Sequence, residues 1–221
     1  MEANFVIAID GPAGAGKSTV AKILAAKLSL SLLDTGAMYR CIAIAACEKG
    51  MDESAGDEAL ATLTRTCRIR FEPGQPQSVF LNDVDVTTSI RTLEIGQLAS
   101  AISVHPSVRR VLVSQQQAIV RQGRWVLEGR DITTVVAPHA QVKVFLTASI
   151  EERARRRWLE AKERGQLDSL QSVVKDVVIR DHRDYTRDDS PLTLAEDAII
   201  IESFGLTPEQ VAEKIAELSA S

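Results

Sequence analysis

A glycine-rich segment placed between an apolar run and a helical pattern constrains this chain more than any other feature of its sequence. Residues 5–9, FVIAI, form an uninterrupted apolar run, as in strands that are buried on both faces of a parallel sheet. The next segment, Gly11-Pro-Ala-Gly-Ala-Gly16-Lys17-Ser18, matches the pattern G-x-x-x-x-G-K-[ST]. From Thr19 to Ser29 apolar residues recur at helical spacing. The sequence therefore predicts a strand, a phosphate-binding loop and a helix in succession.

The residue types of this segment, called the phosphate loop below (residues 11–18), fit the binding of a nucleotide. Its glycines let successive backbone N–H groups point inward, and the N-terminus of the following helix adds partial positive charge around a β-phosphate. We expect Lys17 to lie across the β- and γ-phosphates and Ser18 to offer its hydroxyl to Mg²⁺. The alternative is a flexible glycine-alanine turn before a helix, which would bind nothing.

The rest of the chain alternates between strand and helix patterns, which predicts a layered α/β fold with a parallel sheet. Further strands are expected at residues 31–33, 125–127, 142–146 and 198–201. Helices are expected at residues 37–47, 93–103, 108–121, 151–163 and 168–183, and from residue 208 onward. Between Arg68 and Thr88, alternating residues with turn signals at Pro73-Gly74 and Asn82-Asp83 predict a small antiparallel ribbon.

Composition excludes several functional classes. The chain has 221 residues with 26 basic and 30 acidic side chains, so its net charge of -4 argues against a general affinity for nucleic acid or anionic membrane. Neither a membrane span nor a signal peptide is visible, which favours the cytoplasm. The three cysteines, Cys41, Cys47 and Cys67, are expected to be reduced thiols in the core. Arginine occurs 18 times and lysine 8 times, which suits a protein that grips polyphosphate but also fits codon bias.

Two charged clusters follow predicted strands, at the sheet edge where α/β proteins bind ligands. Residues 34–40, DTGAMYR, bring together a carboxylate, an aromatic ring and a guanidinium. The alternative is that Asp34 or Thr35 only caps a helix. Residues 128–131, EGRD, come after the strand at 125–127, and Glu128 is a weak match to the acid that holds Mg²⁺ in ATPases. The GTPase patterns D-x-x-G and N-K-x-D are absent from the sequence.

Two further clusters are rich in arginine and lie on predicted helices. Arg153, Arg155, Arg156 and Arg157 fall within five positions, and residues 180–192 read RDHRDYTRDDSPL. Arginines on a polar helix often form a solvated face, and nearby glutamates could pair with the first group. Both readings of that group stay open from the sequence.

Six motifs together carry a resemblance to a known family. The segments DGPAGAGKST, LLDTGAMYR, LAS (98–100) to PSVR (106–109), EGRDI, EERARRR and RDHRDYTRDDSPL occur in the order and spacing of bacterial-type cytidylate kinases. The chain resembles this branch of the nucleoside monophosphate kinases over nearly its whole length. The resemblance implies an α/β, three-layer P-loop kinase fold with a five-stranded parallel sheet, a small antiparallel β insert and a helical lid.

The resemblance also implies domain organisation and activity. It implies one domain over residues 1–221, with an inserted acceptor-binding subdomain around 66–103 and a lid around 151–168. The implied reaction moves the γ-phosphoryl group of ATP onto CMP or dCMP and gives ADP and CDP or dCDP, with Mg²⁺ as cofactor. The implied partners are these nucleotides, with no nucleic acid and no membrane, and the implied state is a monomer.

Site residues follow from the resemblance motif by motif. ATP is expected to contact Gly11, Pro12, Ala13, Gly14, Ala15, Gly16, Lys17, Ser18 and Thr19. CMP is expected to contact Asp34, Tyr39, Arg40, Ser100, Arg109, Arg130, Asp131, Arg180, Asp184 and Arg187. The expected catalytic residues are Lys17, Arg130, Arg153, Arg156 and Arg157, and the expected metal ligand is Ser18.

The chain departs from the family in one stretch. The family usually reads GRDIGTVVFPDA, whereas this chain reads GRDITTVVAPHA, with Thr133, Ala137 and His139 at the unusual places. Thr133 in place of glycine puts in question the backbone path after Asp131. His139, like His105 and His182, is expected at the surface. Two rival functions remain from the sequence: another small-molecule kinase such as an adenylate or shikimate kinase, and an ATP-binding module without an acceptor.

Overall fold

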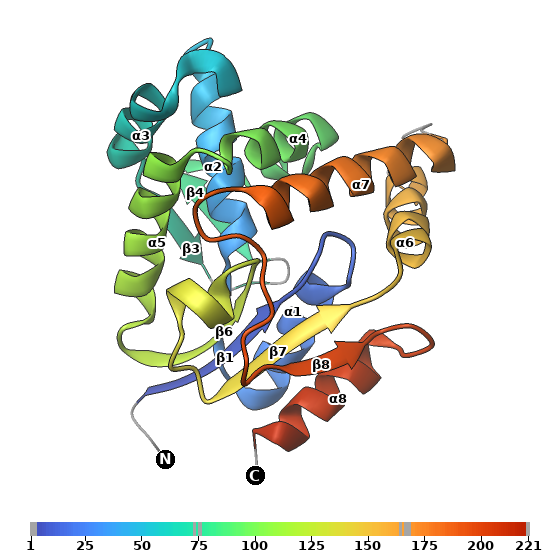
Figure 1. The fold of residues 1–221 in the computed structure, drawn as a ribbon. Helices are drawn as coiled ribbons and strands as arrows, with labels where there is room; N and C mark the ends of the chain where they lie inside the picture. The colour runs from blue at the N-terminus through green and yellow to red at the C-terminus, as the bar shows by residue number, and fades with distance from the viewer. Residues whose placement is uncertain (1–3, 73, 75–76, 164, 166–168, 220–221) are drawn as a thin grey trace. The chain divides into compact units, whose positions relative to one another are not determined.

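A computed structural model describes residues 4–72, 74, 77–163, 165 and 169–219 (Figure 1). Contacts between residues divide the chain into two compact units: a large unit of residues 1–32 and 120–221, and a small unit of residues 33–119. The small unit is wider than the insertion expected at residues 66–103. That these residues form an acceptor-binding subdomain stays a prediction.

The main sheet has the order β2-β6-β1-β7-β8 among the described residues, and the pairs β1–β6, β1–β7 and β7–β8 are parallel. Its strands are β1 (Asn4–Asp10), β2 (Ser31–Asp34), β6 (Gly123–Glu128), β7 (Val142–Thr147) and β8 (Ile199–Glu202). The predicted α/β class with a five-stranded parallel sheet is therefore confirmed. The apolar run at residues 5–9 lies in the central strand β1, where Ile7, Ala8 and Ile9 are fully buried. The carboxyl ends of β1 and β6 consequently lie side by side.

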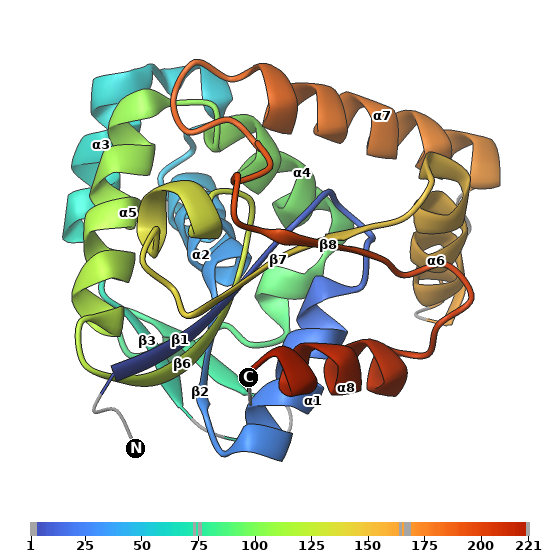
Figure 2. The same cartoon turned by 60° about the horizontal axis from the view of Figure 1, so that its bottom comes forward.

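Besides the sheet, the large unit contains two pairs of α-helices. They are α1 (Lys17–Leu28), α6 (Ile150–Glu163), α7 (Leu170–Thr186) and α8 (Pro208–Leu218). Helices α1 and α8 pack against each other and against the sheet (Figure 2). Helix α8 begins with Pro208 at its first position, as the sequence predicts. Thr207 and Gln210 also form a capping box there. Helices α6 and α7 pack through Ala154 and Val177.

The small unit combines helices with a separate antiparallel sheet. Its helices are α2 (Thr35–Glu48), η1 (Glu53–Ala55), α3 (Asp57–Thr66), η2 (Ser89–Arg91), α4 (Leu93–Ile102) and α5 (Pro106–Val120). Its strands are β3 (Ile69–Glu72), β4 (Ser78–Leu81) and β5 (Val84–Asp85), in the order β3-β4-β5. The predicted ribbon is thus confirmed, and Asn82 and Asp83 form its turn with φ angles of 49° and 68°. Of the other expected turn, Pro73 lies outside the described residues.

Cysteines and membrane segments can be checked directly. Cys41 and Cys67 are buried and reduced as expected, but Cys47 is exposed near the end of α2, so its placement in the core was wrong. Burial raises the pKa of the Cys41 thiol to about 12, which makes it unreactive. In the described part of the chain, no helix combines the length and the apolar character needed to cross a membrane.

Candidate functional site

The phosphate loop joins the end of β1 to the first residue of α1, as predicted. Lys17 begins the helix and is buried, and its Nζ donates hydrogen bonds to the carbonyl oxygens of Gly11 at 2.7 Å and Pro12 at 2.8 Å. The loop therefore curls around the ammonium group. Thr19, which was also expected to contact ATP, is exposed two residues further along the helix.

Two glycines of this loop have no room for a side chain. A Cβ on Gly11, whose φ is +146°, would lie 1.9 Å from the carbonyl oxygen of Leu146 in β7. A Cβ on Gly14, whose φ is +81°, would lie 2.9 Å from the carbonyl oxygen of Arg153 in α6. Both positions also need a left-handed backbone that L-residues rarely adopt. The loop thus packs tightly between β7 and the start of α6.

Opposing electrostatic effects act on the pKa of Lys17. Burial, followed by repulsion from Arg130, lowers the pKa of the Lys17 ammonium to about 7. The carboxylates of Glu128, Asp184 and Asp10 oppose this decrease. An anion placed beside the ammonium would stabilise its charged form. Binding of an anion there would therefore raise the pKa of Lys17.

Ser18 and Glu128 form a second polar contact at the same sheet edge. The Ser18 hydroxyl donates to Glu128 Oε1 at 2.5 Å, and Glu128 is the buried last residue of β6. From the sequence, Glu128 is only a weak match to a metal-binding acid, because it comes close to Ser18 only through the pairing of β6 with β1. A hydroxyl and a carboxylate are oxygen donors of the kind that Mg²⁺ prefers. No cluster of three or more His, Cys, Asp or Glu side chains suited to a metal occurs among the described residues.

Three guanidinium groups surround one carboxylate after β6 and along α7. Asp184 Oδ2 accepts a hydrogen bond from Arg130 Nε at 2.7 Å, and Asp184 Oδ1 lies 3.6 Å from an Arg187 nitrogen. Burial alone would raise the pKa of Asp184, but Arg130, Arg180 and Arg187 outweigh it and hold that pKa below its ordinary value. Asp184 thus interacts with guanidinium groups from the segment after β6 and from α7, and Arg130 also interacts with the carboxylates of Glu128 and Asp181. These four predicted residues are thus brought together within the large unit.

Asp10 was not predicted as a site residue, yet it is fully buried and holds the segment after Asp131. Its carboxylate accepts hydrogen bonds from the Ile132 N–H at 2.9 Å, the Thr133 N–H at 2.7 Å and the Thr133 hydroxyl at 2.6 Å. Residues Ile132–Val136 form η3, a short π-helix. Thr133 is absent from the residues with positive φ, so this path does not require the family's glycine.

The four clustered arginines of α6 divide into different environments, which their spacing could not reveal. Arg153 is buried; its guanidinium donates to the carbonyl oxygens of Ala148 and Ala13, both at 2.9 Å, and to both carboxylate oxygens of Asp181, at 3.1 and 2.6 Å. Its observed contacts are with protein groups, and they bind the phosphate loop to α6 and α7. The expected catalytic role of Arg153 stays a prediction.

Arg155 and Arg156 share one acidic partner but not one environment. Both donate to Glu152, but Arg155 is exposed, as a solvated helix face would require. Arg156 is half-buried and also donates to the Ser203 hydroxyl at 2.9 Å and the Ala15 carbonyl oxygen at 3.4 Å. Arg156 thus lies at the phosphate loop. Arg157 is half-buried as well. Part of the expected lid, residues 164 and 166–168, lies outside the described residues.

In the small unit, Asp34 and Arg40 both make polar contacts with the neighbouring residues Ile90 and Arg91 of η2. Asp34 caps α2 by accepting from the Ala37 N–H at 2.9 Å, and it accepts from Arg91 at 3.3 Å. The capping alternative is thus correct for Asp34, and binding to CMP stays a prediction. Arg40 donates to the Ile90 carbonyl oxygen at 3.0 Å. A Cβ on Gly96 would lie 2.8 Å from Arg40 Nη1, so this glycine of α4 makes room for the guanidinium.

Three other predicted residues gather near α4 and α5. The guanidinium of Arg109 is buried, lies 5.5 Å from the centre of the Tyr39 ring and donates to the Ser103 carbonyl oxygen at 3.3 Å. The Ser100 hydroxyl is buried and has no hydrogen-bond partner among the described residues. A buried hydroxyl without a partner is costly, so a polar ligand there would be favoured.

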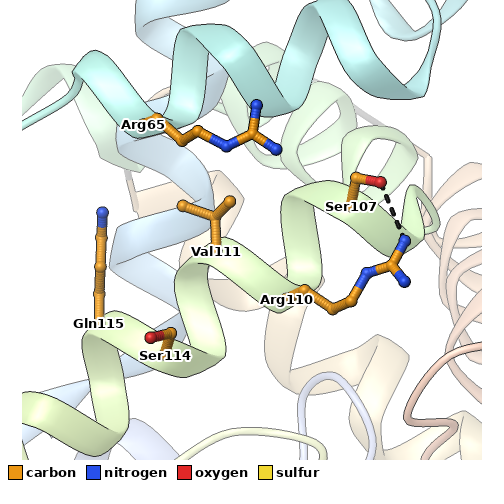
Figure 3. A pocket seen from close by; sticks show the side chains of 6 residues that line it. All are labelled: Arg65, Ser107, Arg110, Val111, Ser114 and Gln115. Carbon is orange, nitrogen blue, oxygen red and sulfur yellow. Dashed lines mark hydrogen bonds between the residues drawn. The ribbon is translucent and has the colours of Figure 1, made fainter.

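A groove of about 590 Å³ also opens in the small unit between α3 and α5 (Figure 3). Arg65 lines it from α3; the residues that line it from α5 are Ser107, Arg110, Val111, Ser114 and Gln115. Arg110 donates to the Ser107 hydroxyl at 3.0 Å. None of these residues was predicted to bind nucleotide. Of the histidines, His139 and His182 are exposed as expected, whereas His105 is half-buried beside Asp57.

Comparisons with known proteins agree with the motifs. The model of the family described as Cytidylate kinase matches residues 7–221. A cytidylate kinase of Listeria welshimeri is 47% identical over 219 residues, which cover 99% of this chain and 97% of the relative. That of Carboxydothermus hydrogenoformans is 48% identical over 214 residues, 96% of each chain. An uncharacterized protein from Eubacterium ventriosum, of known structure, has a TM-score of 0.52 at 11% identity over 99% of each chain, which supports the fold alone. By its sequence and the match over nearly its whole length, the chain belongs to the cytidylate kinase family.

Proposed function

We infer that this protein transfers the γ-phosphoryl group of ATP to CMP or dCMP, forming ADP and CDP or dCDP. Family membership supports this reaction. The observation that carries it in the structure is a phosphate loop with a buried lysine, in the same unit as three guanidinium groups around Asp184. A triphosphate donor and an anionic acceptor need these two kinds of site.

The chemistry of this transfer needs charge and alignment rather than a general base. The acceptor oxygen belongs to a phosphate that is already ionised at neutral pH, so no side chain has to remove a proton. Lys17 and Arg130 would neutralise charge on the moving phosphoryl group, and Arg156 and Arg157 would add charge from α6. Water has to be excluded, because hydrolysis of ATP competes with the transfer.

We propose that Ser18 and Glu128 hold Mg²⁺, Ser18 as a ligand and Glu128 as its carboxylate partner. Their oxygen atoms lie 2.5 Å apart at the end of β6 and the start of α1. When bound, Mg²⁺ would neutralise charge on the β- and γ-phosphates. The two side chains contribute a partly buried, oxygen-only donor set for it.

The acceptor residues are proposed separately for each unit. In the small unit, Asp34, Tyr39, Arg40, Ser100 and Arg109 would contact CMP. In the large unit the residues would be Arg130, Asp131, Arg180, Asp184 and Arg187. The Asp131 carboxylate suits the N4 amino group of cytosine, and a guanidinium such as that of Arg109 suits its N3 and O2 acceptors. We also propose that the enzyme is a cytoplasmic monomer that uses ATP, CMP and dCMP and binds neither nucleic acid nor membrane.

A panel of acceptors tests this function. ADP formation from ATP and Mg²⁺ should depend on CMP or dCMP, and kcat/KM for CMP should exceed that for UMP by about ten- to a hundredfold. UMP offers an oxygen acceptor where cytosine has its amino donor, so it would repel the carboxylate of Asp131. ATP binding without acceptor-dependent turnover would instead indicate a binding module, and a preference for AMP or shikimate would indicate another kinase.

The same panel with Asp131→Asn tests how the base is read. An asparagine amide can rotate to donate to O4 of uracil, so the variant should use CMP less well while the gap to UMP narrows. The measurement is kcat/KM for both acceptors in both proteins. An unchanged CMP to UMP ratio in a folded variant would show that Asp131 does not read the base.

Arg156 and Arg155 allow a matched test of α6. Arg156→Ala should lower kcat roughly tenfold with little change in the KM for CMP, because it removes a charged donor beside the phosphate loop. Arg155→Ala removes the same charge from the same partner, Glu152, on the exposed side of the helix and should leave kcat within about twofold. Equal kcat values for the two variants would mean that the α6 arginines only solvate the helix.

A further inference from the structure

The buried carboxylate of Asp10 joins two segments of the site that are far apart in sequence. Asp10 is the last residue of β1 and comes directly before Gly11, which is wedged against β7. Its two carboxylate oxygens accept three hydrogen bonds from Ile132 and Thr133. These donors include the first backbone N–H groups of η3, which have no partners inside such a short helix. Asp10, at the end of β1, therefore caps the N-terminus of η3.

The segment fixed in this way carries the residues on which the proposed reaction depends. The Gly129 N–H donates to the Ile9 carbonyl oxygen at 3.0 Å, so the chain is tied to β1 on both sides of Arg130 and Asp131. Arg130 is close enough to Lys17 to lower its pKa. The position of these side chains relative to the phosphate loop thus depends on contacts made by the end of β1.

We propose that Asp10 and Thr133 are a pair of positioning residues that hold Arg130 and Asp131 in place relative to the phosphate loop. This proposal rests on the proposed function for its effect on turnover. The Asp10 carboxylate acts through the two N–H groups of η3, and the Thr133 hydroxyl adds a third bond at 2.6 Å. Thr133 is therefore part of the site's support and more than a tolerated replacement for glycine. Displacement of a reacting group by about 1 Å can cost a hundredfold in rate, so such support is needed.

Neighbouring residues of η3 provide a matched comparison. Thr133→Val keeps the shape of the side chain and removes only the hydroxyl that donates to Asp10. Thr134→Val makes the same change one residue further on, where the buried hydroxyl has no hydrogen-bond partner among the described residues. Thr133→Ser keeps the hydroxyl. In Asp10→Asn, an NH2 group takes the place of one carboxylate oxygen. Since both oxygens accept from a backbone N–H, this NH2 group would face another donor and one hydrogen bond of the cap would be lost.

The test combines kinetics with hydrogen exchange. In Thr133→Val, kcat/KM for CMP should fall about threefold to tenfold, the effect of losing one typical hydrogen bond, while the KM for ATP stays within about twofold. Thr133→Ser should restore the lost activity, and Thr134→Val should match the wild type. Amide exchange of residues 130–136 should become faster in Asp10→Asn and Thr133→Val, but not in Thr134→Val.

Three results would overturn the proposal. In the first, Thr133→Val has the same kcat/KM for CMP as the wild type. In the second, Thr133→Val and Thr134→Val lose kcat/KM equally. In the third, Thr133→Ser loses as much kcat/KM as Thr133→Val. Melting temperatures separate positioning from general destabilisation, since a loss that follows the melting temperature across the variants would also contradict it. Failure of the proposed function has a different signature: the wild type would show no CMP-dependent ADP formation, while the exchange effects at residues 130–136 would persist.

Discussion

Lys17→Ala is expected to lower kcat by roughly a hundredfold to a thousandfold, the effect of removing one group that stabilises charge in the transition state. The fold should survive, because the ammonium group is buried and costs free energy in the absence of nucleotide. Its removal leaves only the carbonyl oxygens of Gly11 and Pro12 without their donor. The measurements are kcat with saturating ATP and CMP, and circular dichroism for the fold.

The variants Lys22→Ala and Lys17→Arg are the controls for Lys17→Ala. Lys22 lies on the same helix but is exposed, so Lys22→Ala should keep the wild-type kcat. Because the pKa of Lys17 is about 7, its charged form is present below that pH and lost above it, and kcat/KM for ATP should decline as pH rises through 7. Lys17→Arg keeps its charge and should lack this decline. Near-normal turnover by folded Lys17→Ala would contradict the role of Lys17.

Asp181→Ala is expected to destabilise the protein by about 3–5 kcal/mol, which is the usual effect of breaking a buried ion pair from one side. The guanidinium of Arg153 would remain buried, with only the carbonyl oxygens of Ala13 and Ala148 as partners. The side chains of Arg153 and Asp181 are 5% and 12% exposed, so water cannot replace the lost carboxylate. The quantity to measure is the free energy of unfolding in urea.

Arg155→Ala is the control for this measurement. It breaks an ion pair with Glu152 on the same helix, but the Arg155 side chain is 57% exposed, so the free energy of unfolding should stay close to that of the wild type. The double variant Arg153→Met with Asp181→Leu removes both charges and should regain part of the stability. A change below 1 kcal/mol in Asp181→Ala would mean that the pair contributes little to the fold.

The elements that sequence periodicity could predict are those with strong and simple patterns. The fully apolar run of β1, the alternation of the ribbon and the proline-initiated α8 were all identifiable from residue types. Helix α3 was missed, because it follows Gly56 without a side-chain cap and buries only a few residues such as Leu60. The π-helix η3 was also missed. Its sequence ITTVV is rich in β-branched residues, which favour strands, and it is stabilised by Asp10 from elsewhere in the chain.

The same distinction applies to the candidate site. The phosphate loop was identifiable because its pattern is local. Arg130 is 54 positions from Asp184, and only the family resemblance placed both of them in the same site. Asp10 and Asp181 could not be identified in this way, since their partners lie more than 25 positions away and only the folded chain brings them together. Helical spacing placed four arginines on α6, but it could not show that Arg153 is buried beside α7 while Arg155 is in water. Which arginine supports the fold and which faces solvent is decided by packing.

The tight approach of α6 to the phosphate loop also determines where motion can begin. Gly14 touches the backbone of Arg153, and the Arg153 guanidinium is bonded to Ala13 on one side and Asp181 on the other. The first turn of α6 and the loop therefore form one rigid body, and they cannot separate without breaking these contacts together. Arg156, three residues further along α6, also donates to the Ala15 carbonyl oxygen at 3.4 Å and to the Ser203 hydroxyl at 2.9 Å. Any outward movement of this part of α6 from the phosphate loop would therefore have to break the contacts of both arginines.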